Sequence, residues 1–323
     1  MKIKASLLAG LIASAPFVLA QDVEIATDPV GYVSVDLAAA SDTRISVPMH
    51  RTPAFQGIPE SVDGTSIHFA EGTGIQPENL DYFVAVRNGD LAGLRATVVS
   101  VENDGDTLVL EDGVDLSGLS TGEGGDSVQL IPHTTLGWLF RELEVTDGSQ
   151  VLVFDRSEPG INNAASQVFD FNASTGQWED IFGTSQDDTV IHQTDSIIVR
   201  EGGGDDLTLV IDGSVPMFPH QDILSTATAD APQDLAIGFS VPAVVTLGES
   251  GLGQNGDQLL VPANDETGIN KAAAQVIEYS DGWQDIFGTD MSGFELEPGV
   301  GYTYRKAGTA EPQTFVHTPS YLD

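Results

Sequence analysis

The stretch Gly160-Ile161-Asn162-Asn163-Ala164-Ala165-Ser166-Gln167-Val168 returns as Gly268-Ile269-Asn270-Lys271-Ala272-Ala273-Ala274-Gln275-Val276. A second shared block follows each copy, first as Trp178-Glu179-Asp180-Ile181-Phe182-Gly183-Thr184 and then as Trp283-Gln284-Asp285-Ile286-Phe287-Gly288-Thr289. The first pair of blocks stands 108 residues apart and the second pair 105. Two matched blocks in one order and at nearly one offset indicate that the C-terminal part of the chain is a duplicated unit.

Strand patterns are dense along the whole chain. Residues 82–86, 95–101 and 107–110 are short apolar or alternating runs joined by Gly-containing turns, which predicts a three-stranded meander. Within the duplicated part, strands are expected at residues 151–154, 167–171 and 196–200 and at corresponding places in the second copy. No long window has a 3.6-residue apolar period, so the chain is predicted to be mainly β.

These patterns suggest three structural parts after a leader. We expect a small N-terminal β-barrel or sandwich over residues 21–132, followed by two homologous β-rich repeats over 133–212 and 213–323. A chain of 323 residues is too long for one compact core, which agrees with several domains. Asn162 and Asn270 are expected to cap a turn in each repeat through side-chain to backbone hydrogen bonds.

The first 20 residues have the composition of a secretory signal peptide. Lys2 and Lys4 precede an apolar run that ends in small residues, so cleavage is expected after Ala20. The chain has no Cys, which excludes disulfides and thiolate metal sites. The expected location is extracellular or periplasmic.

The charge is strongly negative, with 49 Asp and Glu against 12 Lys and Arg and a formal net charge of −37 at pH 7. Such a surface repels nucleic acid and anionic lipid. It suits a saline medium, where salt screens the repulsion between like charges. The acidic residues are spread along the chain, as expected for a solvated surface.

Several further segments resemble an uncharacterised paralogous family of secreted proteins from Verrucomicrobium-type bacteria. The segments are Thr27-Asp28-Pro29-Val30-Gly31-Tyr32, Val47-Pro48-Met49-His50-Arg51, Tyr82-Phe83-Val84, Gly93-Leu94-Arg95, Asp115-Leu116-Ser117-Gly118, Pro132-His133-Thr134-Thr135-Leu136 and the two Gly-Ile-Asn blocks. The resemblance implies export and a repeated β architecture, and it carries over no functional residues. The many paralogues in that family suggest a surface or matrix role.

Trp178 and Trp283 occupy matched places in the two repeats. One interpretation makes them surface platforms on which sugars stack, one in each repeat. The other makes Trp, Ile and Phe of each block the core of a repeat, with Gly183 and Gly288 turning the chain.

Calcium is the cofactor that the acidic turns could hold, because hard cations bind several oxygens on flexible loops. The candidate ligands are Asp104, Asp106, Asp205, Asp206 and Asp257. The alternative is that these turns are only solvated, since a chain so rich in acids produces such clusters by composition. No helix-loop-helix calcium pattern is present.

No catalytic residue can be assigned. The metalloprotease, phosphate-loop and nucleophile-elbow motifs are missing from the sequence, and the six His are scattered along it. The sequence favours an exported, non-catalytic structural or interaction protein of the cell surface or extracellular matrix that binds itself or other surface proteins. A carbohydrate-binding protein and a polysaccharide hydrolase with a carboxylate pair stay open as alternatives. Neither nucleic acid binding nor membrane insertion is expected.

Overall fold

The computed structural model describes residues 28–70, 73–74, 81–308 and 312–322, so the predicted signal peptide and its cleavage point at Ala20 lie outside the described residues. The described residues form many strands and few helical turns, which confirms the mainly β prediction, and their paired strands are antiparallel. Among these residues, the helical elements are one four-residue helix, α1 (Leu136–Leu139), and two 3₁₀ turns, η1 (Asn103–Gly105) and η2 (Ser320–Leu322). Within the described ranges, no helix has the length and apolar character needed to span a membrane.

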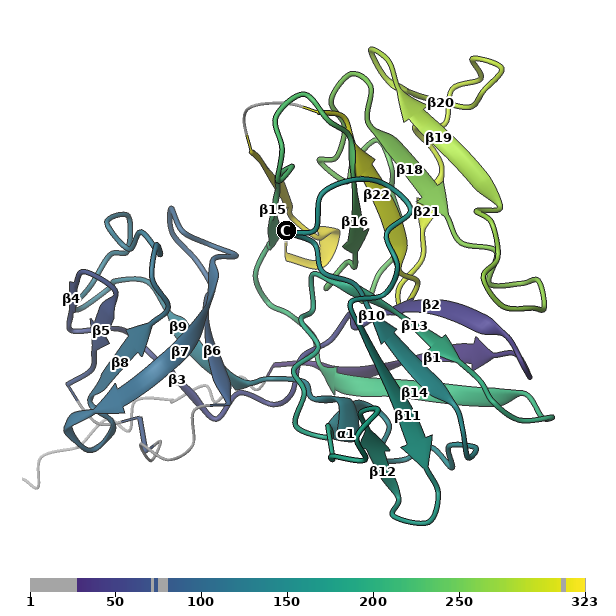
Figure 1. The fold of residues 1–323 in the computed structure, drawn as a ribbon. Coiled ribbons are helices and arrows are strands. Elements are labelled where there is room, and N and C mark those ends of the chain that lie inside the picture. Colours follow the sequence, from purple (N-terminus) through teal and green to yellow (C-terminus); the bar gives the residue numbers. More distant parts are fainter. Residues whose placement is uncertain (1–27, 71–72, 75–80, 309–311, 323) are drawn as a thin grey trace, which may run out of the picture.

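One seven-stranded sheet forms a separate body, which Figure 1 shows to one side of the rest of the chain. Its strands, in the order β3-β9-β6-β7-β8-β5-β4, are β3 (Phe55–Gly57), β4 (Ser61–Asp63), β5 (Ser66–His68), β6 (Tyr82–Val86), β7 (Arg95–Glu102), β8 (Thr107–Leu110) and β9 (Val128–Pro132). The predicted meander is confirmed as β6-β7-β8. Alternate residues of these strands bury one apolar core, which includes Ile67, Val84 and Leu108.

A five-stranded sheet in the order β12-β11-β10-β13-β2 and the pair β1-β14 form a second body, here called the first unit. Its strands are β1 (Val30–Leu37), β2 (Asp42–Ser46), β10 (Gln150–Val153), β11 (Gln167–Asn172), β12 (Gln177–Glu179), β13 (Ser196–Arg200) and β14 (Leu207–Ser214).

A sheet with the corresponding order, β20-β19-β18-β22-β16, forms the second unit together with the pairs β15-β23 and β17-β21. Its strands are β15 (His220–Leu224), β16 (Gln233–Ile237), β17 (Val245–Thr246), β18 (Gln258–Val261), β19 (Gln275–Tyr279), β20 (Trp283–Gln284), β21 (Glu295–Leu296), β22 (Tyr302–Lys306) and β23 (Gln313–His317). Figure 1 shows the two units packed next to each other.

The strand pairing corrects the predicted domain boundaries. β1 pairs with β14 and β2 pairs with β13, so residues 30–46 belong to the first unit and not to an N-terminal domain over 21–132. The seven-stranded body is therefore an insertion of residues 55–132 between β2 and β10. The range 133–212 is an incomplete unit because it lacks the two strands before the insertion. The strands of the second unit lie within 213–323.

Candidate functional site

Each of the two Gly-Ile-Asn loops forms hydrogen bonds with the other unit. The loop of the second unit meets an ion pair of the first, in which Arg200 Nε donates to Asp42 Oδ1 at 2.7 Å and Arg200 Nη2 donates to Asp42 Oδ2 at 3.1 Å. The Asn270 backbone N–H donates to the same carboxylate at 2.6 Å, and Asn270 Oδ1 accepts from Arg200 Nη2 at 3.0 Å. The Asp42 N–H donates to the carbonyl of Gly268 at 3.0 Å.

The same set of contacts occurs in the opposite direction. Arg305 donates to Asp234 at 2.7 and 3.0 Å, and the Asn162 N–H donates to Asp234 Oδ2 at 2.8 Å. Arg305 Nη2 donates to Asn162 Oδ1 at 3.3 Å, and the Asp234 N–H donates to the Gly160 carbonyl at 2.9 Å. We call these two sets the reciprocal clasp, made of Asp42, Arg200, Gly268 and Asn270 on one side and of Asp234, Arg305, Gly160 and Asn162 on the other.

The chemistry of the clasp explains the residue types in the repeated block. Asn162 and Asn270 have φ values of 56° and 52°, in the left-handed region that Asn tolerates better than most residues. Hydrogen bonding to the aspartates raises the pKa of Arg200 and Arg305. The sequence correctly placed Asn162 and Asn270 at turns. In the clasp, however, their side-chain oxygens accept from an arginine of the other unit.

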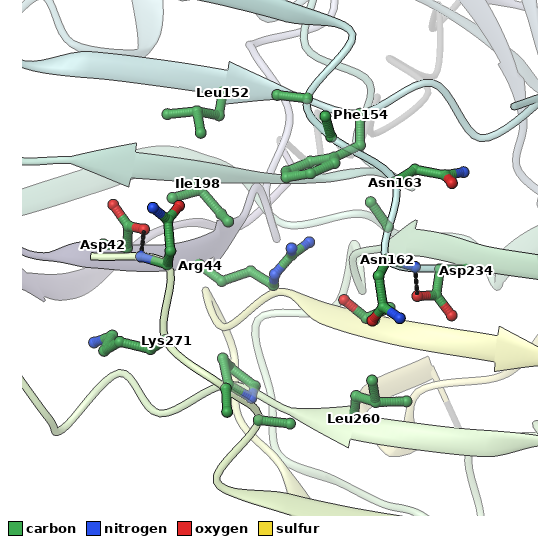
Figure 2. A pocket seen from close by; sticks show the side chains of 18 of the residues that line it. Asp42, Arg44, Leu152, Phe154, Asn162, Asn163, Ile198, Asp234, Leu260 and Lys271 are labelled. Atoms are coloured by element: carbon green, nitrogen blue, oxygen red, sulfur yellow. Dashed lines mark hydrogen bonds between the residues drawn. The ribbon is translucent and has the colours of Figure 1, made fainter. Parts of the chain in front are cut away.

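A cavity of about 530 Å³ lies between the two units, next to the clasp. Figure 2 shows Asp42 and Asp234 on opposite sides of it and the Arg44 side chain between them. Its lining is mixed, with the apolar side chains Leu152, Phe154, Val168, Ile198 and Leu260 beside Asp, Asn, Arg and Lys side chains of both units. The strands β2, β10, β11, β13, β16, β18 and β22 and the two Gly-Ile-Asn loops supply most of the lining.

A second feature follows each Trp. After β12, the Asp180 side chain accepts from the N–H groups of Phe182 and Thr184, both at 2.9 Å. Gly183 has a φ of 74°, which lets the chain reverse over so short a turn. The result is a tight turn that leaves Ile181 79% and Phe182 84% exposed.

The corresponding turn after β20 has the same construction. Asp285 accepts from the N–H groups of Phe287 and Thr289, both at 2.8 Å, and the bond from Thr289 is the main cause that lowers its pKa. Ile286 is 79% and Phe287 86% exposed. We call the two segments, 180–184 and 285–289, the Ile-Phe turns. The prediction that Ile and Phe of each block belong to the core is therefore wrong.

The two Trp are buried, and the assignment of Trp178 and Trp283 as sugar-stacking platforms is wrong. They are 2% and 3% exposed and lie in the cores of the first and second units. Trp178 packs against Phe140 and Phe171, and Trp283 packs against Tyr279. The interpretation that the repeated block forms the core of each unit is therefore confirmed for its Trp but not for its Ile and Phe.

In the described part of the chain, no group of three or more His, Asp and Glu is arranged to hold a metal ion, so calcium binding stays a prediction. Asp257 is fully buried and accepts from the Tyr304 hydroxyl and from the N–H groups of Gln254 and Ala307, so its oxygens are occupied by protein donors. Asp106, Asp205 and Asp206 are exposed on turns of different sheets, and the Asp104 side chain is outside what is described.

Scattered His come together where the three bodies meet, which the sequence did not predict. The rings of His133 and His192 lie 5.9 Å apart, and His50 stacks on Phe218 with ring centroids 5.8 Å apart. Burial lowers the pKa of His50 and His133 to about 4, so both rings are neutral at pH 7. These His act as packed aromatic rings in the junction.

Comparison with family models, with curated proteins and with solved structures finds no match to this chain. The resemblance to secreted proteins of Verrucomicrobium-type bacteria therefore stays a prediction.

Proposed function

We propose that the protein is an exported, non-catalytic structural component of the cell surface or extracellular matrix that associates with further copies of itself through the Ile-Phe turns. The observation that carries this proposal is the exposure of Ile181, Phe182, Ile286 and Phe287 on two turns of the same construction. Adjacent apolar side chains that form one exposed surface mark interaction sites more often than isolated ones do.

The position of the turns supports self-association. They follow β12 and β20, each of which is an end strand of its sheet. Figure 1 shows β12 and β20 at opposite ends of the paired units. A molecule with an equivalent contact site at each end can link to two others, which permits growth beyond a dimer into an open chain.

The size of the contact sets its strength. An Ile and a Phe so exposed offer on the order of 250 Å² of apolar surface. Contact between two turns then removes at most roughly 500 Å² from water, about 12 kcal/mol at 25 cal/mol/Å². This is comparable with the 4–15 kcal/mol or so that association costs, so we expect weak, concentration-dependent links.

The net charge of −37 opposes association at low salt. At about 1 M salt the Debye length falls to about 3 Å, and repulsion between copies is largely screened. We therefore expect assembly to increase with salt, as suits the saline extracellular setting that we propose for this chain.

Sedimentation velocity tests the proposal on the chain that begins at Gln21, over a range of concentrations in low and high salt. We expect species larger than a dimer in high salt. Phe182→Ser or Phe287→Ser alone should stop growth at the dimer, and the double variant should be monomeric. Tyr32→Ser removes another aromatic side chain, 72% exposed on β1, and should assemble like the wild type.

Two results would reject self-association through these turns. The first is a monomeric wild type at every salt and protein concentration. The second is a double variant that assembles as the wild type does.

A further inference from the structure

The reciprocal clasp is symmetric, but the cavity beside it is not, and Arg44 is one of the lining residues without an equivalent in the other unit. Arg44 lies on β2 two residues after the clasp residue Asp42, and Ala236 lies on β16 two residues after Asp234. Arg44 is opposite Ile198 on β13, and Ala236 is opposite Thr303 on β22, so the two positions correspond. Since an Ala fills this position in one unit, the fold does not need a cation there.

The Arg44 guanidinium has few partners of its own. Nη1 donates to Ser196 Oγ at 3.0 Å, and the group lies over the Phe154 ring, 4.8 Å from its centroid. Among the described residues no carboxylate forms an ion pair with it. The two acids whose charge acts on it, Asp42 and Asp234, are already bound by Arg200 and Arg305.

Arg44 remains a cation despite its half-buried position. Burial lowers its pKa to about 10, which still leaves it protonated at neutral pH. A guanidinium has five N–H donors in a planar fork that fits a carboxylate, and one of the five is used by Ser196. The remaining donors face the cavity or its edge, because none of the Arg44 nitrogens is a buried atom without a partner.

The cavity concentrates positive charge in a very acidic chain. Arg44, Arg200 and Lys271 line it, and Arg305 binds the lining residue Asp234, so four of the twelve Lys and Arg gather here. Arg200 and Arg305 are neutralised by their aspartates, which leaves the two cations Arg44 and Lys271 and one further lining acid, Asp155, whose carboxylate accepts from Ser157. A surface that repels anions elsewhere is locally attractive to a single negative charge at this place.

The shape of the cavity favours a ligand with an apolar body. About 530 Å³ is within the range of small-molecule sites, and aliphatic and aromatic side chains, Phe154 among them, lie beside the single free guanidinium. The two loops contribute small side chains to the lining, Ala164 and Ala165 from one and Ala272 and Ala273 from the other. Since Ala164, Ala272 and Ala273 are exposed, we take this side as the rim and entrance of the cavity.

We propose that the cavity between the units binds a small organic monocarboxylate with an apolar body, whose carboxylate pairs with the Arg44 guanidinium. The apolar part lies against Phe154, Ile198 and Leu260, and the charge-assisted pair fixes its orientation. A doubly charged phosphate fits less well, because one free guanidinium faces it and the flanking aspartates repel a second negative charge. The proposal is independent of the Ile-Phe turns.

Isothermal titration calorimetry on the chain from Gln21 tests this with octanoate as the probe, 1-octanol as its uncharged counterpart and inorganic phosphate as a competitor. We expect octanoate to bind at least ten times more tightly than 1-octanol, and phosphate not to displace it. Arg44→Gln should weaken octanoate at least tenfold. Arg141→Gln, which removes an equal charge from a surface pair with Asp212, should leave it unchanged.

Ala273→Trp provides a second variant that keeps Arg44. Its side chain is exposed at the rim, so the change fills the entrance without touching a core, and octanoate binding should be lost. If Arg44→Gln does not fold, as judged by circular dichroism, this variant decides the location of the site.

Three outcomes would overturn the proposal. They are failure of the wild type to bind octanoate at millimolar concentration, equal binding of octanoate and 1-octanol, and octanoate binding that Ala273→Trp leaves unchanged. Displacement of octanoate by phosphate would show that the cavity does not prefer a monocarboxylate with an apolar body.

Discussion

Removal of the Asp42 carboxylate tests whether the reciprocal clasp holds the two units together. The Asp42 side chain is 7% exposed, and it accepts from Arg200 twice and from the Asn270 N–H once. Asp42→Ala leaves the guanidinium and the backbone N–H without their acceptor. Breaking a buried ion pair from one side costs about 3–5 kcal/mol.

The expected cost lies at the lower end of that range. Arg200 is 22% exposed, so water can reach its guanidinium after the change and restore part of the lost solvation. We expect a loss of about 3 kcal/mol in the free energy of unfolding, with a fall in Tm of about 6–12 °C at 2–4 °C per kcal/mol. Asp234→Ala removes the corresponding carboxylate and should cost the same within about 1 kcal/mol.

Thermal and urea unfolding measure the total effect, and hydrogen exchange at the Asn270 amide measures it locally. This amide donates to Asp42, so it should exchange at least ten times faster in Asp42→Ala. Asp212→Ala is the matched control, because its pair with Arg141 is 49% and 29% exposed and should contribute no more than about 1 kcal/mol. If Asp42→Ala costs no more than Asp212→Ala, the clasp is not what joins the units.

Three further predictions concern the cores, the junction and the turns. The folded pKa of His50 and His133 is about 4 and the ordinary value is 6.5, so the unfolded chain protonates first as the pH falls. The stability that the two neutral rings contribute is complete above pH 6.5 and declines toward pH 4, by up to about 3 kcal/mol for each ring. In urea unfolding measured across this pH range, His50→Asn should make the decline smaller. Tyr304→Phe removes the hydroxyl that donates to the buried Asp257 and should lower the free energy of unfolding, measured in urea, by about 1–3 kcal/mol. A change below about 0.5 kcal/mol would show that this hydrogen bond is unimportant for stability. Gly183→Ala places a Cβ on a residue with a φ of 74°, which should destabilise the protein by about 1 kcal/mol and lower its melting temperature. An unchanged melting temperature would contradict the described turn.

The sequence predicted local strands better than their pairing. The meander over residues 82–110 was found because its strands are neighbours in the chain and its turns contain Gly. The pairing of β2 with β13 was missed because 158 residues separate Asp42 from Arg200. The inserted body also moves the first two strands of the unit away from the rest of it in the sequence. Apolar residues on matched strands are interchangeable, so β2 and β16 share little more than Asp and Ile.

The candidate site was partly visible in the sequence. The Gly-Ile-Asn blocks marked the place where the units meet, since a clasp built from specific hydrogen bonds permits few substitutions. Their partners Asp42 and Asp234 were not identified among 49 acids, and Arg44 gave no local signal. The exposure of Phe182 and Phe287 was missed because an apolar pair reads as core, although the Asp two residues before each Phe and the Gly after it are typical of a turn.

The reciprocal clasp has the symmetry of a homodimer contained within one chain. Each unit gives a loop and receives one, as identical subunits do across a two-fold axis. In a single isolated unit, the Asp-Arg pair would lack a loop that binds to it, and the Gly-Ile-Asn loop would lack an Asp-Arg pair. Such a unit would need a second copy to form these contacts. Fusion of two such subunits makes that association independent of concentration. It also frees the two halves of the shared cavity to differ, as Arg44 and Ala236 do.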